Sequence, residues 1–497
     1  MFCMTSEDFS LAFCTVGFSL IFCDKGFSGS ILLRVGPLQE RFVEKMKAWV
    51  LAFCLLGVLA KTPEEWKSRT IYQIVTDRFA RGNGDYSPCE NLKDYCGGTF
   101  KGIQKHLDYI QGMGFDAIWI SPILPNTPGS YHGYAAVDFY GINPHFGTEQ
   151  DFIDLVEACH KRDIWIMLDV VANHVGPVDN YSKINPFDRS EYYHPYCPIQ
   201  NWNNETEVEW CWLFTLPDLS QEHPYVRRTL ISWINWIVNK YNIDGLRVDT
   251  AMEVPKDFWV EFTKSSGVYA VGEVFNGDIH FVSKYQGPLS GVLNYPLYFT
   301  LKDLFAYDKD MYEARTFMES MKEFPDQKLL ASFVDNHDNA RFLNIQPNIK
   351  RFQNAIAWSL VTNNIPIVYY GDEQSFNGGN DPQNREVLWP YLNNTDSTMY
   401  KFISEVVSYR KRHQIWNYPW IERYADHHFY CYSMGKAMAA FSNTDEDITR
   451  EVTYHPYKEG EVICDIFWKE DCITVTNGAV EVVLLKGETK LYEPKNP

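Results

Sequence analysis

The stretch Gly245-Leu-Arg-Val-Asp-Thr250 ends a short apolar run with an acid, and an arginine precedes the acid by two residues. Three distant segments resemble it: Asp169-Val-Val-Ala-Asn-His174, Val271-Gly-Glu-Val274 and Phe333-Val-Asp-Asn-His-Asp338. Taken singly, an acid at a strand end is best interpreted as a cap or a loop residue. Asp249, Glu273 and Asp338 each close a different run, however, and together they indicate a pocket of carboxylates. Cleavage of a glycosidic bond requires such a pocket.

Strand-like and helix-like stretches alternate between residues 70 and 413. Helical periodicity marks Thr148–Arg162, Pro224–Tyr241 and Ile349–Thr362, among others. The strands we expect are Ile71–Phe79, Ala117–Pro122, Trp165–Val171, Gly245–Asp249, Val268–Val274, Gly291–Leu297, Leu329–Asp338 and Ile365–Glu373. This alternation predicts an α/β protein with a parallel sheet, closed as a (β/α)₈ TIM barrel rather than open and doubly wound. The first strand is followed by no glycine-rich phosphate loop, which also disfavours the open sheet.

Two regions depart from the alternation. The polar stretch 174–219 is too long for a simple loop, so it predicts a small subdomain inserted after the third strand. From residue 416 to 497 the runs are short and alternating, which predicts a C-terminal antiparallel β-sandwich domain. The catalytic barrel would then comprise residues 61–173 and 220–415.

Cysteine spacing favours an oxidising compartment. Among the twelve cysteines, three pairs bracket short polar loops: Cys89 and Cys96, Cys197 and Cys211, and Cys464 and Cys472. Such intervals predict disulfides. Neither a Cys-x-x-Cys pair nor a Cys/His quartet is present, which argues against a zinc site. We expect Cys159 and Cys431 to be buried thiols.

The segment 46–60 predicts a signal peptide, because a basic start is followed by an apolar stretch and a small-residue cleavage site. The apolar stretch is too short to span a bilayer comfortably. We interpret residues 1–45 as a non-native upstream extension, with Met46 as the true start; the alternative is a retained anchor that includes Phe9–Cys23. Removal of this signal peptide predicts a secreted protein, or one in the lumen of a secretory or digestive compartment. The sequons at Asn180, Asn204 and Asn393 fit a glycoprotein.

The overall charge limits the possible partners. A net charge of −19 argues against binding to nucleic acid or to an anionic membrane. A neutral polymer is compatible with it. Aromatic residues make up 16% of the chain, which suits stacking on flat ligand faces, although composition alone favours a large aromatic core.

With these segments in view, the chain resembles the α-amylase family of glycoside hydrolases, in particular fungal-type secreted α-amylases, over roughly residues 63–493. Besides the four segments, the resemblance includes Gly114-Phe-Asp-Ala-Ile-Trp-Ile-Ser-Pro122, Tyr131-His-Gly-Tyr134, Leu216-Pro-Asp-Leu219 and Gly378-Gly-Asn-Asp-Pro-Gln-Asn-Arg-Glu386. It implies that Asp249 is the nucleophile, Glu273 the proton donor and Asp338 the residue that stabilises the transition state. It also implies the residues that line the sugar sites: His132, Tyr134, His174, Arg247, His337, Asp381 and Arg385. From its place in the strand, we expect Arg247 to keep Asp249 ionised, since a neighbouring cation depresses a carboxylate pKa.

The resemblance further implies a structural Ca²⁺ between the barrel and the insertion. Asn173, Glu209 and Asp218 match the ligand positions, with the carbonyl of Glu253 as another candidate. Calcium prefers six to eight hard oxygens, which these segments supply. The alternative is that Glu209 and Asp218 are solvated loop acids.

Two departures from the family pattern concern the substrate. The Lys and His that follow the Gly245–Thr250 segment in fungal-type enzymes are Met252 and Glu253 here, and the aromatic expected after Tyr134 is Ala135. Losing these contacts should weaken sugar binding by roughly 1–3 kcal/mol each. The catalytic carboxylates are unaffected.

The leading hypothesis is a secreted, calcium-dependent, retaining α-amylase, monomeric and without stable membrane association. It would hydrolyse internal α-1,4 bonds in starch, glycogen and maltooligosaccharides. The alternative is an α-glucosidase or a maltogenic relative with altered leaving-group sites. Two hypotheses from other classes are a non-catalytic amylase-like domain, such as a transporter heavy subunit, and a glucan-binding protein without turnover. The first of these requires a membrane-spanning helix.

Overall fold

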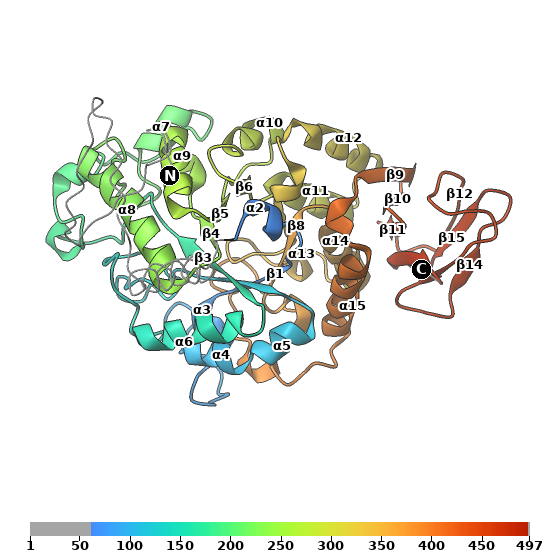
Figure 1. Ribbon diagram of the computed structural model, residues 1–497, viewed down its shortest axis with the longest axis horizontal. Helices are drawn as coiled ribbons and strands as arrows, with labels where there is room; N and C mark the ends of the chain where they lie inside the picture. Colours follow the sequence, from blue (N-terminus) through green and yellow to red (C-terminus); the bar gives the residue numbers. More distant parts are fainter. Residues whose placement is uncertain (1–60, 496–497) are drawn as a thin grey trace, which may run out of the picture. The chain divides into compact units, whose positions relative to one another are not determined.

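The computed structural model describes residues 61–495. The expected upstream extension (1–45) and signal peptide (46–60) lie outside the described residues. The confirmed architecture is a parallel barrel with an insertion after its third strand and antiparallel sheets at the C-terminal end (Figure 1).

Eight parallel strands form the barrel. They are β1 (Ile71–Ile74), β2 (Ala117–Ile120), β3 (Trp165–Val170), β4 (Gly245–Val248), β5 (Tyr269–Gly272), β6 (Gly291–Val292), β7 (Ala331–Ser332) and β8 (Ile365–Tyr369). The sheet order runs β6-β5-β4-β3-β2-β1-β8-β7. A parallel bridge between Leu293 and Ala331 connects the two ends, because the N–H of Asn294 donates to the carbonyl of Ala331 at 2.8 Å. The sheet is therefore closed around its axis.

Helices surround the strands in Figure 1. They are α2 (Pro63–Trp66), α3 (Thr76–Phe79), α4 (Phe100–Lys105), α5 (Leu107–Gly112), α6 (Glu149–His160), α7 (Glu205–Trp210), α8 (Pro224–Tyr241), α9 (Lys256–Ser266), α10 (Ile279–Val282), α11 (Tyr295–Phe305), α12 (Tyr312–Ser320), α13 (Phe342–Ile345), α14 (Ile349–Leu360) and α15 (Thr398–His413). The helix expected over Pro224–Tyr241 is present with the same ends. Thr148 caps α6, because its side chain accepts from the N–H of Asp151.

All eight predicted strands extend past the observed ones, and four of them do so by four residues or more. The run Ile71–Phe79 turns into α3 after Ile74, and the run Gly291–Leu297 turns into α11 at Tyr295. The runs Leu329–Asp338 and Ile365–Glu373 likewise end as strands at Ser332 and Tyr369. In each case the apolar pattern continues past the strand, because the chain beyond the strand is also buried.

Side chains alternate between the inside and the outside of the barrel. In β2, Ala117 and Trp119 belong to the interior cluster, whereas Ile118 and Ile120 pack against the surrounding helices. In β5, Tyr269 and Val271 are the interior residues. Because the side-chain period of a strand is two, the next interior position after Val271 is Glu273. The interior rows of the barrel therefore lead directly to the acids at the strand ends.

The insertion contains α7 and the disulfide Cys197–Cys211. The disulfides Cys89–Cys96 and Cys464–Cys472 are also present, which confirms the three predicted pairs. Cys159 and Cys431 are buried and free, as expected.

The C-terminal region consists of antiparallel strands. They are β9 (Trp420–Ala425), β10 (Phe429–Met434), β11 (Ala437–Ser442), β12 (Ile448–Val452), β13 (Val462–Asp465), β14 (Cys472–Thr474), β15 (Val480–Leu484) and β16 (Lys490–Pro494). Six of them form one sheet, and β12 pairs with β15 in a second. The hydroxyl of Tyr409 in α15 donates to the carbonyl of Tyr492 at 2.8 Å, which ties this region to the last barrel helix.

Candidate active site

The carboxyl ends of β3, β4 and β5 place four charged side chains together. Asp169 and Arg247 lie near the ends of β3 and β4 and are directly paired across the two strands. Asp249 follows β4, and Glu273 follows β5. Working residues of barrel enzymes are found at this end of the strands.

Arg247 is the centre of this cluster. Its Nη1 lies 2.6 Å from Asp249 Oδ1 and 3.0 Å from Asp169 Oδ1, and its Nη2 lies 2.8 Å from Glu273 Oε2. The arginine is completely buried. A single planar guanidinium thus fixes three carboxylates, at the ends of three adjacent strands, relative to one another.

Glu273 has two further partners. The hydroxyl of Tyr295 donates to Oε1 at 3.2 Å, and the backbone N–H of Thr250 donates to Oε2 at 3.2 Å. The Glu273 side chain keeps 12% of its surface exposed. The carboxylate is therefore oriented by the protein yet still accessible.

Asp338 reaches the cluster from the loop that follows β7. Its Oδ2 lies 3.2 Å from His337 Nε2, and its Oδ1 lies 3.4 Å from Arg385 Nη2. At 36% side-chain exposure it is more open than Asp249 or Glu273.

Three rings lie in parallel beside the carboxylates. Tyr134 stacks on His337 with centroids 5.2 Å apart and on His132 with centroids 5.7 Å apart. The Tyr134 hydroxyl donates to Asp169 Oδ2 at 2.7 Å and lies 2.7 Å from His337 Nε2. These contacts make the column of rings part of the same hydrogen-bonded unit as the acids.

The two other residues expected at the sugar sites adjoin this unit. His174 Nε2 lies 3.1 Å from the carbonyl of Tyr134. Asp381 Oδ1 lies 3.1 Å from Arg385 Nη1, and its side chain is half exposed. The structure thus brings all ten predicted catalytic and sugar-site residues into one connected network.

Desolvation raises the pKa of the three aspartates of the site. It raises the pKa of Asp249 well above its ordinary value, and Arg247 opposes this effect. We expected Arg247 to depress the Asp249 pKa; its own contribution has that sign, but desolvation is larger because only 6% of Asp249 is exposed. Burial raises the pKa of Asp169 to about 6, and the partial desolvation of the more open Asp338 raises its pKa as well.

Burial has the opposite effect on the histidines. It lowers the pKa of His337 well below the ordinary value, and the nearby Arg247 lowers it further. For His132, burial and then Arg385 lower the pKa to about 3. Both rings are therefore neutral near pH 7 and can donate and accept hydrogen bonds.

Some contacts of the cluster come from residues outside the ten predicted catalytic and sugar-site residues. Trp119 Nε1 donates to Asp169 Oδ2 at 3.0 Å, and Asn336 Nδ2 donates to the Tyr295 hydroxyl at 3.0 Å. Trp119 had a usable signal, since it is an interior position of β2 in the period-two pattern. Tyr295 begins a helix, so periodicity could not indicate its direction.

Comparisons with known proteins agree with this geometry. The family model described as "Alpha amylase, catalytic domain" matches residues 73–394. The alpha-amylase of Saccharomycopsis fibuligera is 38% identical over 458 residues, which cover 87% of this chain and 92% of that protein. The solved alpha-amylase of Malbranchea cinnamomea is 39% identical with a TM-score of 0.84, and the match covers 88% of this chain and 98% of that one. The chain belongs to the alpha-amylase family. It is therefore a glycoside hydrolase of a family that acts on α-glucans, as the sequence motifs predicted.

The calcium ligands implied by the resemblance to the alpha-amylase family lie at the base of the insertion. Asn173 Oδ1 and Asp218 Oδ1 are both buried, and neither has a hydrogen-bond partner. The N–H of Leu219 donates to the Asn173 carbonyl at 2.8 Å, so the two segments run side by side. Helix α7, which carries Glu209, packs against the 3₁₀ turn that ends at Glu253.

These donors fit calcium. The buried oxygens Asn173 Oδ1 and Asp218 Oδ1 lack a hydrogen-bond partner, and buried polar atoms normally have one. Amide, carboxylate and main-chain carbonyl oxygens are the hard ligands that calcium prefers. Among residues 61–495 no group of three His, Cys, Asp or Glu side chains is arranged to hold a metal, so the fit depends on this mixed set.

The positions that depart from the alpha-amylase family pattern are all buried. Met252 is 4% exposed and packs in the main hydrophobic core. Glu253 is 6% exposed and its Oε2 has no hydrogen-bond partner, while Ala135 is 3% exposed. Met252 therefore offers no cation at this point of the barrel.

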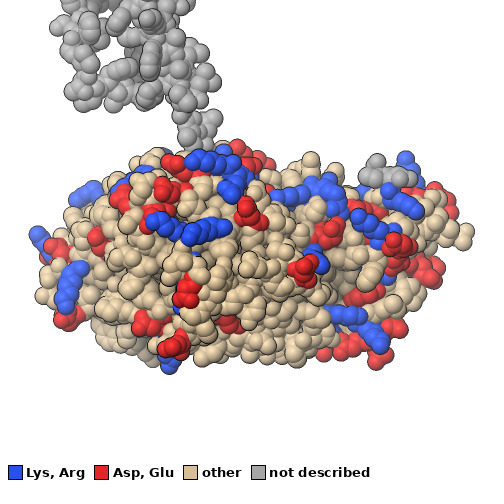
Figure 2. Space-filling view, turned by 90° about the horizontal axis from the view of Figure 1, so that it is seen from below, with Lys and Arg blue, Asp and Glu red and all other residues tan. Residues whose placement is uncertain are grey.

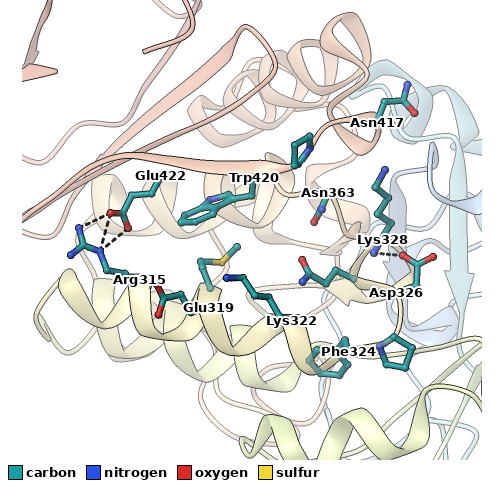
Figure 3. A pocket seen from close by; sticks show the side chains of 14 residues that line it. Arg315, Glu319, Lys322, Phe324, Asp326, Lys328, Asn363, Asn417, Trp420 and Glu422 are labelled. Carbon is teal, nitrogen blue, oxygen red and sulfur yellow. Dashed lines mark hydrogen bonds and ion pairs between the residues drawn. The ribbon is translucent and has the colours of Figure 1, made fainter. Parts of the chain in front are cut away.

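A groove of about 630 Å³ lies elsewhere, between α12 and β9 (Figure 3). Gln327 and Asn363, which line it, precede β7 and β8. The groove is therefore at the amino end of the strands, opposite the carboxylates. It is not the site described above.

Proposed function

We propose that this chain is an endo-acting α-amylase that hydrolyses α-1,4-glucosidic bonds with retention of anomeric configuration. The observation that carries the proposal is the shared contact of Asp249 and Glu273 with Arg247 at adjacent strand ends. A retaining glycosidase needs two such carboxylates, one as nucleophile and one as acid and base.

In the first step Glu273 gives a proton to the glycosidic oxygen while Asp249 attacks the anomeric carbon. The bond to the leaving sugar breaks, and a glycosyl ester forms on Asp249. In the second step Glu273 removes a proton from water, the water oxygen bonds to the anomeric carbon, and the carboxylate of Asp249 is released. Arg247 holds both carboxylates in place, and Asp338 stabilises the positive charge that develops on the sugar.

Substrate contacts come from the residues around these acids. Tyr134 would stack on a sugar ring, while neutral His132, His174 and His337 would hydrogen-bond sugar hydroxyls. Arg385 and Asp381 extend the same wall. On the face seen in Figure 2 acidic and basic side chains are interspersed, so that face carries no large patch of a single charge.

Asn173, Glu209, Asp218 and the carbonyl of Glu253 would hold Ca²⁺. When bound, the ion would cross-link the insertion to the barrel and would act as a structural element rather than as a reactant. His174 directly follows Asn173. A bound ion that holds Asn173 in place would therefore also hold His174, which is expected to contact the sugar.

Export fits the modification sites and disulfides of the chain. The three disulfides indicate an oxidising compartment, and the sequons at Asn180, Asn204 and Asn393 are exposed. No described helix is long and apolar enough to cross a membrane. We propose a secreted, monomeric glycoprotein without stable membrane association.

An α-glucosidase or maltogenic enzyme is the second candidate, because Met252 and Glu253 alter the expected leaving-group side. Viscometry on soluble starch separates the two: endo attack lowers viscosity rapidly at a small number of new reducing ends. Release of glucose alone from maltose, without loss of viscosity, would overturn the endo assignment. Proton NMR of the first products checks retention, since the α-anomer should appear first.

A further inference from the structure

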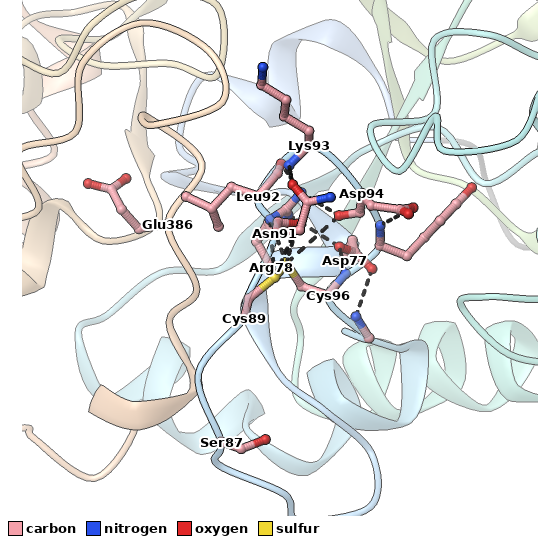
Figure 4. The surroundings of a disulfide bond; sticks show 12 residues. Asp77, Arg78, Ser87, Cys89, Asn91, Leu92, Lys93, Asp94, Cys96 and Glu386 are labelled. Atoms are coloured by element: carbon pink, nitrogen blue, oxygen red, sulfur yellow. Dashed lines mark hydrogen bonds and ion pairs between the residues drawn. A yellow bond between two sulfur atoms is a disulfide. The ribbon is translucent and has the colours of Figure 1, made fainter.

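Arg78 occupies the loop that the disulfide Cys89–Cys96 closes (Figure 4). Its Nη1 lies 2.7 Å from Cys96 Sγ, and its Nη2 donates to the carbonyls of Leu92 at 2.8 Å and Asp94 at 3.0 Å. The loop therefore wraps around this guanidinium.

The neighbouring Asp77 fixes Arg78 from the other side. Asp77 Oδ2 lies 3.2 Å from Arg78 Nε, and both side chains are fully buried. Asp77 also accepts from the N–H groups of Cys96 at 2.6 Å and Gly97 at 3.0 Å. Any shift of Arg78 would break a buried ion pair, which is costly.

Arg78 lies over the face of Tyr131. The guanidinium carbon is 3.8 Å from the ring centroid, and Tyr131 is 3% exposed. Cation–π contacts are strongest when they are desolvated in this way. The disulfide loop therefore holds Arg78 against the ring of Tyr131.

The hydroxyl of Tyr131 reaches two residues of the candidate active site. It donates to Asp381 Oδ1 at 3.1 Å and accepts from Arg385 Nη1 at 3.2 Å. Arg385 in turn donates from Nε to the carbonyl of His337 at 2.8 Å and places Nη2 3.4 Å from Asp338 Oδ1. A continuous set of contacts therefore connects the disulfide loop with Asp338.

We propose that Tyr131 is a positioning residue that holds Arg385 and Asp381 in place for the sugar, and that Arg78 transmits the order of the disulfide loop to it. The inference rests on the proposed function, because this pair acts on turnover only through a bound glucan. The disulfide loop then sets the affinity of the candidate active site for its substrate.

Tyr131→Phe tests the hydroxyl while keeping the ring on Arg78. We expect KM on maltoheptaose to rise roughly tenfold and kcat to stay within about threefold, because a hydrogen bond to charged partners is lost and the carboxylates remain. A purely structural role would lower Tm and leave KM unchanged. An unchanged KM would overturn the assignment.

Two disulfide variants test the path through Arg78. Cys89→Ser with Cys96→Ser should raise KM several-fold, whereas the matched pair Cys464→Ser with Cys472→Ser should lower Tm only. In the Tyr131→Phe background, loss of Cys89–Cys96 should add little to KM, since both changes act through one hydroxyl. Full additivity would contradict transmission through Tyr131.

The same comparison in a Glu273→Gln background separates this inference from the proposed function. There, calorimetry measures maltoheptaose affinity without turnover. Weaker binding on adding Tyr131→Phe supports the positioning role even if wild-type protein fails to hydrolyse starch, a failure that would refute only the proposed function. Equal affinity with and without Tyr131→Phe would refute the positioning role.

Discussion

The Nη1 atom of Arg247 in β4 lies 2.6 Å from Oδ1 of Asp249, two residues further along the chain and just beyond the end of that strand. The same guanidinium contacts Glu273, which follows the neighbouring strand. A buried cation between two carboxylates offsets their repulsion and fixes their separation. Arg247 therefore determines the geometry of the two acids.

Replacing Arg247 with leucine should abolish hydrolysis and destabilise the protein. The change leaves buried carboxylates uncompensated, and breaking a buried ion pair typically costs about 3–5 kcal/mol. Urea unfolding measures the loss. Arg315→Leu is the matched control, because its pair with Glu422 is partly exposed, at 46% and 22% of the two side chains, and solvent-screened pairs contribute about 1 kcal/mol or less. Comparable losses in the two variants would contradict the account of Arg247. If the leucine variant does not fold, Arg247→Lys provides the milder change, with reduced kcat expected.

Glu273→Gln should abolish hydrolysis but leave starch binding intact, because glutamine keeps the shape of the side chain and cannot protonate the leaving oxygen. Reducing-end release and maltoheptaose calorimetry measure the two properties separately. Undiminished turnover would refute the role of Glu273 as proton donor.

Removal of calcium should lower the melting temperature. A ligand present at a hundred times its Kd stabilises the folded state by about 2.7 kcal/mol, which EDTA would remove. Asn173→Ala should lower Tm in calcium and make it insensitive to EDTA, whereas Asn203→Ala, an exposed position in the same insertion, should behave like wild type. An EDTA-independent Tm in the wild-type protein would count against the site.

Asp465 should make stability fall as pH rises. Burial raises its pKa to about 7 in the folded state, against about 3.9 in an unfolded chain. Between these values the folded state keeps a proton that the unfolded state releases, so the free energy of unfolding decreases with rising pH. Asp465→Asn should flatten the decrease between about pH 4 and pH 7. Glu470→Gln, at an exposed position, should leave the dependence of the free energy of unfolding on pH unchanged. Equal pH dependence in the wild type, Asp465→Asn and Glu470→Gln would contradict the account.

The barrel and the acids at its strand ends could be predicted because side chains along a strand alternate with a period of two residues. Buried parallel strands read as apolar runs, and the inward row of each run ends at Asp169, Asp249 or Glu273. The strand ends could not be predicted, since the chain beyond Ile74 and Val292 stays buried after the strand stops.

Contacts between side chains that are far apart in the chain could not be predicted from the sequence either. Nothing local indicates that Tyr295 bonds Glu273 or that Tyr131 joins Arg78 to Arg385. The balance between burial and ion pairing at Asp249 likewise depends on the whole surrounding fold.

The central claim is that Asp249 carries the covalent step, and the turnover of Asp249→Asn on soluble starch tests it most directly. The account predicts a fall in kcat of roughly a thousandfold or more, with a melting transition that shows a folded protein. Turnover within about tenfold of wild type would contradict the assignment of Asp249 as nucleophile.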